Sequence, residues 1–261
     1  MDSGLRFAAI DIGSNAIRLL FTRVIAKENE TPHFIKESLI RMPLRLGRDA
    51  FTTGYISEKN CDSFVSTIIG FKNLINAYNP ISYRACATAA MRNATNGPDL
   101  VKKVEKFAGI NLDIISGQEE AAMILSKNIN HYLKTKKNYI HIDVGGGSTE
   151  LTIIAKGKKI TSKSFSIGSV RLLENKVQKS YWKVIDDWIG ENTSSLDSIK
   201  AVGSGGNINK IASMLGKYKG KSVHYNDIKQ IIKKISMKNI EERITELGLR
   251  PDRADVIIHA S

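Results

Sequence analysis

A run of carboxylates and glycines near the middle of this sequence has the composition of a site for phosphate and a metal ion. In DVGGGSTEL, Asp143 precedes three consecutive glycines, and Ser148 and Glu150 follow them. Glycine accepts positive φ and has no Cβ, so successive backbone N–H groups can converge on one anion beside the two carboxylates. A plain hairpin turn is the alternative, but such a turn needs only one or two glycines. The segment therefore favours binding of phosphate together with a divalent cation.

A near copy of this segment lies upstream, in DIGSNAIRL. Asp11 precedes Asp143 by 132 positions, and the glycine and leucine that follow each aspartate keep the same offset. An offset of about half the chain predicts two duplicated lobes whose Asp-Gly turns face each other across a cleft, although two short hairpins can also align by chance. The copies differ at one chemically important position, because Arg18 stands where the second copy has Glu150.

A third glycine-rich stretch, Gly203 to Gly206, follows an apolar run that is expected to form a strand at 198–202. The apolar spacing after it predicts a helix, so the glycines would offer free N–H groups and the positive end of a helix dipole to an anion. The stretch matches neither the Walker loop nor the dinucleotide-binding glycine pattern. Alone it is a weak signal, and beside two Asp-Gly turns it supports the same chemistry.

Two further side chains could act on a bound phosphate. Ser116 and Glu119 fit a capping box at the start of a helix, which leaves Glu120 as a candidate general base for water. Stabilisation of the helix dipole, worth about 0.3–1 kcal/mol, explains Glu120 equally well. Arg92 follows a short apolar strand in ATAAMRNATN, where it is either a bidentate phosphate clamp or an ordinary helix-surface arginine.

The elements that must position these residues alternate between strands and helices, which indicates an α/β protein. Apolar spacing predicts a helix that begins near residue 57 and ends at Tyr78, with its apolar face on a sheet. The second half repeats the plan of the first. Strands are expected at 5–11, 17–24, 34–46, 81–87 and 112–115 in the first half, and at 139–143, 149–156 and 160–167 in the second.

Composition agrees with a globular protein that binds an anion. The chain has 261 residues, 42% of them hydrophobic and 25% charged, with 39 Lys and Arg against 26 Asp and Glu. Residues 1–130 hold 16 basic and 13 acidic side chains, and residues 131–261 hold 23 and 13. The basic second half would attract a polyanion, although a merely solvated Lys-rich face explains the excess equally well. No recognition-helix, finger or RNP pattern is present, so no specific nucleic acid is expected.

The remaining features of the sequence are unexceptional. No apolar run approaches the roughly 20 residues of a membrane span, and the N-terminus resembles no secretory signal. We therefore predict a cytoplasmic protein without a membrane partner. Cys61 and Cys86 form no metal-ligand pattern, which favours two reduced thiols.

Seven motifs, in order along the chain, resemble those of the exopolyphosphatase/guanosine pentaphosphate phosphohydrolase (Ppx/GppA) family. The resemblance implies an α/β fold of two RNase H-like lobes with an interlobe cleft, as in actin, hexokinase and the heat-shock-chaperone ATPases. It also implies release of the terminal phosphate of polyphosphate, or of the 5′ γ-phosphate of guanosine pentaphosphate, with Mg²⁺ or another divalent cation. The motifs are DIGSNAIRL, ATAAMRNATN, ISGQEEA, DVGGGSTEL, FSIGSVRL, AVGSGGNI and RADVI.

The resemblance also assigns roles to individual residues. Glu120 matches the general base, Arg92 matches an arginine that contacts phosphate, and Glu150 matches a carboxylate that assists metal or water. Asp11, Asp143 and Glu150 are the expected metal-associated residues. The phosphate would be lined by Gly13, Ser14, Asn15, Gly145, Gly146, Gly147, Ser148, Gly203, Ser204, Gly205 and Gly206.

On this basis we expect an N-terminal lobe at 1–125, with the first phosphate turn and the general base, and a C-terminal lobe at 126–261 with the other glycine-rich turns. Family members continue beyond RADVIIHAS with an apolar helix, so the C-terminal lobe is expected to be truncated. The resemblance is compatible with a homodimer. Two other hypotheses stay open: a non-catalytic sensor of polyphosphate or nucleotide, and an ATPase or kinase of the same fold, for which no adenine-pocket signature is found.

Overall fold

The computed structural model describes residues 4–28, 30–126, 137–217 and 221–260. The chain divides into two compact units, Met1–Ser116 and Gly117–Ser261. This division falls before the helix that carries Glu120, whereas the lobe boundary predicted from the sequence comes after residue 125. The limits of the two lobes therefore stay a prediction. Part of the predicted helix that follows Glu120 lies at 127–136, outside the described residues.

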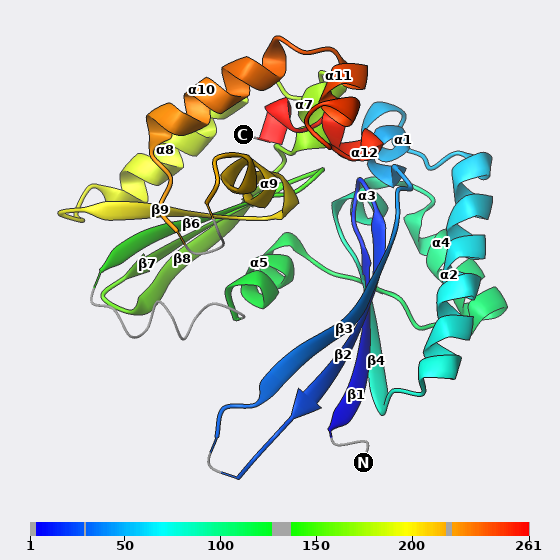
Figure 1. The fold of residues 1–261 in the computed structure, drawn as a ribbon. Helices are drawn as coiled ribbons and strands as arrows, with labels where there is room; N and C mark the ends of the chain where they lie inside the picture. Colours follow the sequence, from blue (N-terminus) through cyan, green and yellow to red (C-terminus); the bar gives the residue numbers. More distant parts are fainter. Residues whose placement is uncertain (1–3, 29, 127–136, 218–220, 261) are drawn as a thin grey trace. The chain divides into compact units, whose positions relative to one another are not determined.

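The first unit is a five-stranded mixed sheet with helices (Figure 1). The strand order is β3-β2-β1-β4-β5; β1, β2 and β3 pair antiparallel, and β4 runs parallel to both β1 and β5. The elements are β1 (Leu5–Ile12), β2 (Ile17–Ile25), β3 (His33–Met42), α1 (Leu46–Thr52), α2 (Glu58–Tyr78), β4 (Ser82–Ala87), α3 (Ala89–Asn93), α4 (Gly97–Ala108) and β5 (Asp113–Ile114).

The predicted helix that ends at Tyr78 is confirmed as α2. Its buried residues recur at three- and four-residue steps, as a helix packed on a sheet requires, and Asn79 ends it in the left-handed conformation, with φ 52°. At its C-terminal end the Tyr78 ring lies 4.3 Å from the ring of Phe21 in β2. The buried residues on α2 are Cys61, Phe64, Ile68, Phe71 and Ile75.

The second unit is a four-stranded sheet of order β8-β7-β6-β9 with helices (Figure 1). Here β6, β7 and β8 pair antiparallel and β9 runs parallel to β6. The elements are α5 (Gly117–Ser126), β6 (Asn138–Val144), β7 (Thr149–Ala155), β8 (Lys158–Phe165), α7 (Ser169–Leu173), α8 (Tyr181–Thr193), β9 (Ile199–Ser204), α9 (Gly206–Met214), α10 (Tyr225–Ser236), α11 (Ile240–Thr245), α12 (Pro251–Ala254) and η1 (Ile258–Ala260).

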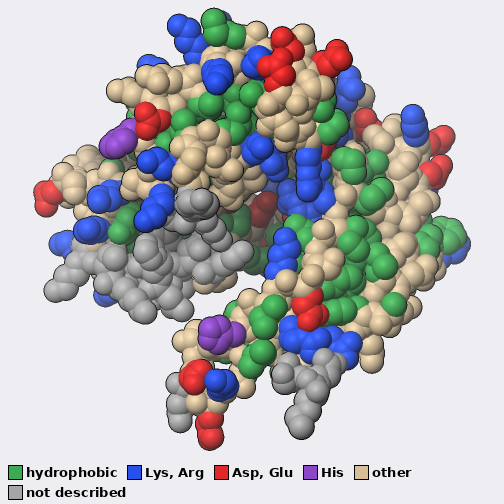
Figure 2. All heavy atoms as spheres, in the orientation of Figure 1, with side chains coloured by type: hydrophobic (Ala, Val, Ile, Leu, Met, Phe, Trp, Pro, Cys, Tyr) green, Lys and Arg blue, Asp and Glu red, His purple; other side chains and the backbone are tan. Residues whose placement is uncertain are grey.

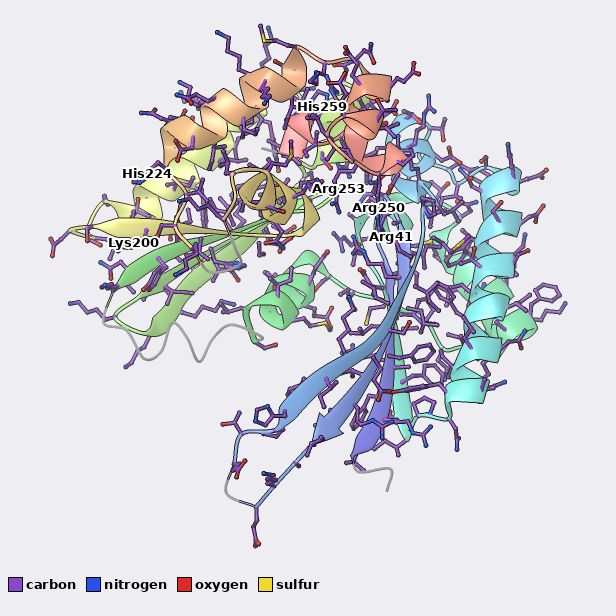
Figure 3. All side chains as sticks on the ribbon, in the orientation of Figure 1. Arg41, Lys200, His224, Arg250, Arg253 and His259 are labelled. Carbon is purple, nitrogen blue, oxygen red and sulfur yellow. The ribbon has the colours of Figure 1, made fainter. Side chains whose placement is uncertain are left out.

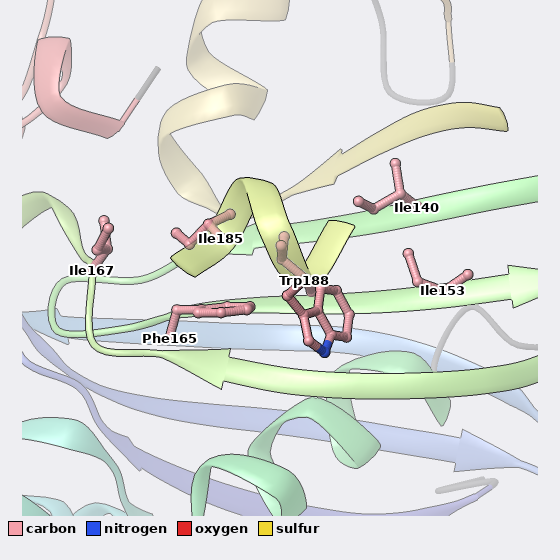
Figure 4. Packing of buried hydrophobic residues seen from close by; sticks show 7 residues of the cluster. Ile140, Ile153, Phe165, Ile167, Ile185 and Trp188 are labelled. Atoms are coloured by element: carbon pink, nitrogen blue, oxygen red, sulfur yellow. The ribbon is translucent and has the colours of Figure 1, made fainter. Parts of the chain in front are cut away.

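Both faces of this second sheet are covered. One face packs on α8, where Trp188 meets Phe165 edge to face at 5.5 Å (Figure 4), an arrangement worth about 0.5–1.5 kcal/mol beyond the area it buries. The other face packs on α5 through Leu125, Tyr139 and Ile154. Because successive strand residues point to opposite faces, a strand covered on both sides is buried along its length. β7 is buried at every position, its polar residues Thr149, Glu150 and Thr152 included.

The internal repeat predicted from the sequence is present in the strand pairing of the two units. Asp11 lies opposite Arg18 in the first hairpin, and Asp143 lies opposite Glu150 in the second. The register of the next strand shifts between Phe21 and Thr22 in the first unit and between Ile153 and Ile154 in the second. These positions all keep the offset of 132, so the two sheets share one plan down to the position of a β-bulge.

The structure departs from the predicted elements where the chain leaves the third strand. The strand expected at 34–46 ends at Met42, and α1 begins at Leu46. The second unit ends in helices α9 to α12 around a small core that includes Ile211, Ile235 and Ile257. Within the described residues, no helix has both the length and the apolar character needed to cross a membrane.

Candidate phosphate-binding site

The glycine turn between β6 and β7 is fastened by the segment that begins α7. The turn closes on itself through a hydrogen bond from Gly145 N to Ser148 O of 2.9 Å. Its three glycine carbonyls then accept hydrogen bonds from three consecutive residues of α7. These bonds run from Ser169 N to Gly145 O (3.0 Å), from Val170 N to Gly146 O (2.8 Å) and from Arg171 Nε to Gly147 O (2.7 Å).

The fastened carbonyls determine where the N–H groups of the turn point. No peptide bond in the described chain is cis, and in a trans peptide the C=O and the N–H point in opposite directions. With its carbonyls directed at α7, the turn therefore directs the N–H groups of Gly146, Gly147 and Ser148 away from α7. None of the described residues accepts a hydrogen bond from these three groups. Three successive N–H groups on one side of a turn form a concave site for an anion.

Gly168 allows α7 to approach the turn this closely. A Cβ at Gly168 would lie 2.5 Å from Gly146 C and O and 2.6 Å from Gly147 N. Its φ of −152° and ψ of 162° are ordinary for any residue, so space rather than backbone conformation excludes a side chain here. The close contact means that the position of Gly168 and the position of the glycine turn are coupled.

The two carboxylates beside the turn lie next to each other. Asp143 and Glu150 are directly opposite partners in the β6–β7 ladder, so their side chains project from the same face. Ser204 Oγ donates to Asp143 Oδ2, and Ser164 Oγ donates to Glu150 Oε1 at 2.8 Å. Glu150 is only 2% exposed. Two like charges directly opposite each other are unfavourable, and a cation between them would relieve the repulsion.

This donor set fits Mg²⁺. That ion typically binds one or two carboxylates and completes its six ligands with water and substrate phosphate oxygens. In the described part of the chain no group of three or more His, Cys, Asp and Glu side chains could hold a metal ion. A dedicated protein cage, of the kind that structural zinc uses, is therefore not found among those residues.

Glu120 lies on the same side of the second sheet as these carboxylates. Its helix, α5, contacts β7 and β8, and Leu125 of α5 packs on Ile154. Ile154 and Glu150 are four residues apart in one strand and so share a face, which is also the face of Asp143. Glu120 thus belongs to the unit that contains the glycine turn. The capping box expected from Ser116 and Glu119 stays a prediction.

A buried histidine completes the polar part of this face. His141 lies two residues before Asp143 in β6, opposite Thr152 of β7, and is 2% exposed. Burial lowers the pKa of His141, and the nearby charge of Asp143 opposes that shift in part. Burial therefore favours the neutral form of the imidazole.

The third glycine-rich stretch meets Asp143 from β9. Gly205 has φ 108° and lies beside the carboxylate, because a Cβ at this position would be 3.5 Å from Val144 O and 3.6 Å from Asp143 Oδ1. Gly206 begins α9, and a Cβ there would lie 2.9 Å from Nη2 of Arg253. The Arg253 guanidinium therefore lies against the start of α9 (Figure 3). Sequence reasoning gave Arg253 no role, although it lies in a quoted motif.

The corresponding turn of the first unit has the same hydrogen bond, from Gly13 N to Ala16 O at 3.1 Å. Its backbone is also fastened by the helix after the third strand, since Gly47 N of α1 donates to Ser14 O at 2.8 Å. The charges differ from those of the second unit. Arg18 Nη1 lies 2.5 Å from Asp11 Oδ2, so Asp11 is ion-paired whereas Asp143 is opposite another carboxylate.

Arg92 lies on the short helix α3 of the first unit. Its Nη1 donates to the carbonyl of Ile115, which follows β5, at 2.7 Å. This bond holds the Arg92 side chain against the segment that follows β5.

Each unit thus gathers its own share of the predicted residues. The described structure places Asp143, Glu150, the glycine turn and the start of α9 together in the second unit, and Asp11 with its turn in the first. Gly203 precedes this corner within β9 and packs on Ile208 of α9. Three residues of the quoted motifs received no role from the sequence: Gly168 and Arg171 in FSIGSVRL, and Arg253 in RADVI.

Comparison with known proteins agrees with this geometry. The Ppx/GppA phosphatase family profile matches residues 24–261. The bifunctional 3-dehydroquinate synthase/phosphatase of Fusobacterium nucleatum subsp. nucleatum is 31% identical over 96% of this chain, which spans 41% of that protein. Exopolyphosphatase 1 of Mycobacterium tuberculosis is 24% identical over 97% of this chain and 78% of its own length.

Solved structures show the same fold. An exopolyphosphatase from Cytophaga hutchinsonii superposes with a TM-score of 0.79 at 22% identity, covering 98% of this chain and 87% of that one. The Aquifex aeolicus member of the Ppx/GppA family gives a TM-score of 0.71 at 24% identity with the same coverage. The predicted α/β fold of two lobes is confirmed. With a family profile that extends over most of its length, this chain belongs to the Ppx/GppA phosphatase family.

Proposed function

We propose that this chain is a phosphohydrolase that releases terminal orthophosphate from inorganic polyphosphate, or the 5′ γ-phosphate of guanosine pentaphosphate, by metal-assisted attack of water. The observation that carries the proposal is the glycine turn of the second unit, with three N–H groups directed away from α7. Phosphoryl transfer depends mainly on positioning and on neutralising the charge of the phosphoryl oxygens. A fixed set of N–H donors beside two carboxylates is suited to both.

Phosphate recognition would come from three sources in the second unit. The N–H groups of Gly146, Gly147 and Ser148 would hold the oxygens of the transferred group. The start of α9 adds free N–H groups and the positive end of a helix dipole. Arg253, beside Gly206, would contribute a guanidinium, which binds phosphate oxygens in a bidentate manner. Lys and Arg side chains are also numerous on the visible face of this unit (Figure 2).

Asp143 and Glu150 are the residues that would hold Mg²⁺. When bound, the ion would neutralise phosphate charge and lower the pKa of a coordinated water. The protein's part is to fix the two carboxylates, through Ser204 Oγ on Asp143 and Ser164 Oγ on Glu150. Asp11 remains a proposed metal-associated residue, but its ion pair with Arg18 would have to be shared or broken for it to take that role.

Glu120 is proposed as the general base. Its carboxylate would take a proton from the attacking water as the bond from the water oxygen to phosphorus forms. The bond from phosphorus to the bridging oxygen then breaks, and that oxygen leaves with the shortened chain. Arg92, whose side chain is held by its bond to the carbonyl of Ile115, is proposed to contact phosphate. The first-unit residues Gly13, Ser14 and Asn15 are proposed to line the phosphate as well.

The proposal is tested by measuring phosphate release from short-chain polyphosphate, guanosine pentaphosphate and ATP in parallel, each with Mg²⁺ and with excess chelator. We expect Mg²⁺-dependent release from one or both of the first two substrates, and the faster of them names the physiological class. Binding of polyphosphate without release from any substrate would contradict hydrolysis and favour a sensor. Transfer from ATP to an acceptor would instead favour a kinase.

A further inference from the structure

We infer that Arg171 is a positioning residue that orients the N–H group of Ser148 toward the phosphate without touching the phosphate itself. The inference rests on the proposed function of the glycine turn. Of the three carbonyls in that turn that α7 fastens, those of Gly145 and Gly146 are held by backbone N–H groups. The carbonyl of Gly147 is held by a side chain, through Nε of Arg171 at 2.7 Å.

The distinction matters because each carbonyl shares a rigid peptide plane with the next N–H group. Any sequence that forms α7 would provide the two backbone donors, so orienting the N–H groups of Gly146 and Gly147 does not require a particular side chain. Orienting the N–H group of Ser148 does. Among the described residues, two side chains donate to glycine carbonyls of this turn. Ser169 Oγ lies 3.4 Å from Gly145 O, which Ser169 N already holds at 3.0 Å, whereas Arg171 Nε is the one described donor to Gly147 O.

Arginine suits this position for two reasons. Its guanidinium is planar and always charged, and its N–H donors, Nε included, have fixed directions in that plane, whereas a lysine ammonium is a flexible point charge. A cation that donates to a carbonyl also polarises the peptide, which makes the opposite N–H a stronger donor. Arg171 therefore both aims the Ser148 N–H group and strengthens it.

The position of α7 supports a fixed geometry for this contact. Gly168, which precedes the helix, packs against the Gly146–Gly147 peptide so closely that a Cβ would not fit. The carbonyl of Arg171 also accepts a hydrogen bond from Lys176 N at 2.8 Å, which holds the helix end. Arg171 thus reaches the turn from a backbone that is itself fastened to the turn.

The sequence offers a direct probe of this role. It contains four Gly-Ser pairs, and each lies in one of the segments discussed here: Gly13–Ser14, Gly147–Ser148, Gly168–Ser169 and Gly203–Ser204. Protein labelled with ¹³C-carbonyl glycine and ¹⁵N-serine therefore gives four peaks in a two-dimensional HNCO spectrum. The peak of the Gly147–Ser148 peptide reports on the N–H group that Arg171 is inferred to orient.

The experiment titrates tripolyphosphate with Mg²⁺ into the wild type, Arg171→Met, Arg171→Lys and a matched control, Arg6→Met. The side chain of Arg6 also donates to a backbone carbonyl, that of Tyr78, at 3.0 Å. Arg6 lies at the start of β1, at the end of the strand away from the Gly13 turn. The same samples are assayed for kcat and KM, and their thermal unfolding is recorded.

We expect the wild type and Arg6→Met to show a ligand-dependent shift of the Ser148 peak. In Arg171→Met that response is lost while the Ser204 peak still responds, and kcat/KM falls about 10- to 100-fold, the effect of one hydrogen bond to a charged group. Arg171→Lys, which keeps the charge without Nε, behaves in the same way and replaces the Met variant if that variant does not fold.

Three results would count against the inference, and they are distinguishable. A wild type without any shift at Ser148 would overturn the phosphate-binding role of the turn, and the inference with it. A normal wild-type shift that both Arg171 variants reproduce at the same affinity would overturn the inference alone. Loss of the Ser148 and Ser204 responses together in both variants would indicate general damage or direct contact of Arg171 with the ligand, and would also reject a positioning role.

Discussion

Replacing Gly168 with alanine tests whether α7 fixes the glycine turn. The added methyl group would lie 2.5 Å from two backbone atoms of Gly146, about 1 Å closer than carbon atoms pack at their optimal separation. Those neighbours are backbone, so the turn or the segment before α7 must move by a comparable distance. Insertion of a methyl group into a close-packed site costs typically about 1–3 kcal/mol. A misplacement of about 1 Å in a catalytic site can lower the rate about 100-fold.

The assay compares kcat/KM for polyphosphate hydrolysis and the free energy of unfolding in urea for the wild type, Gly168→Ala and Gly190→Ala. Gly190 lies in α8 with no atom within 4 Å of its Cβ position, so alanine there should leave activity unchanged and stabilise the helix by about 0.5–1 kcal/mol. We expect the loss of activity in Gly168→Ala to exceed what the fraction unfolded explains. Wild-type activity and stability in Gly168→Ala would refute the coupling of α7 to the turn.

Two further predictions concern single carboxylates. Asp143→Asn removes one of the two carboxylates proposed to bind Mg²⁺. In a metal titration it should raise the Mg²⁺ concentration for half-maximal activity at least about 10-fold. If Asp143→Asn needs no more Mg²⁺ than the exposed control Asp197→Asn, Asp143 is not a ligand. Burial by itself would raise the pKa of Asp49, but hydrogen bonds from Ser57 and Asn60 outweigh it and hold the pKa below its ordinary value of 3.8. Asp49 therefore contributes stability above pH 3.8, and that contribution is lost as pH falls through the lower folded-state value. Asp49→Asn should lower the free energy of unfolding by about 1 kcal/mol at pH 7 and much less below pH 3, as urea unfolding at each pH would show; a pH-independent difference would contradict this.

The local pattern of apolar residues and glycines was sufficient to predict much of the fold. Alternating apolar runs around Asp11 and Asp143 predicted both hairpins, because a strand pair with a glycine turn is determined by neighbours in sequence. The repeat offset predicted that the two sheets share one plan, and the strand pairing confirms it. The matching β-bulge could not be predicted from the sequence. An extra residue in a strand leaves the apolar alternation intact on each side of it, so the pattern does not mark its position.

The errors have local causes. α1 was missed because it has only seven residues and no side-chain cap at Arg45, so neither periodicity nor a start signal marked it. Both tryptophans of α8 lie in an amphipathic stretch, yet Trp188 is buried and Trp182 remains 47% exposed. Six residues at 3.6 per turn place the two rings on different faces of the helix, which the spacing alone could have indicated.

The residues of the candidate site were easier to find in the sequence than the residues that hold them in place. Aspartate, glycine and glutamate at close spacing predicted the turn, because the residues proposed to bind phosphate and metal are local in sequence. The residues that hold the turn from outside are not local to it. Arg171 approaches Gly147 across 24 positions of sequence, and Arg253 approaches Gly206 from the end of the chain. Such contacts depend on tertiary packing, so a sequence pattern names the residues without giving their partners.

The measurement that tests the central proposal most directly is phosphate release from short-chain polyphosphate by wild type and Glu120→Gln, alongside equilibrium binding of tripolyphosphate to both. If Glu120 is the general base of a metal-dependent phosphohydrolase, the variant should release phosphate about 10²- to 10⁴-fold more slowly and bind tripolyphosphate with nearly wild-type affinity. Equal rates for the two proteins would contradict the role of Glu120. A wild type that binds tripolyphosphate with Mg²⁺ but releases no phosphate from any substrate would contradict the hydrolase itself.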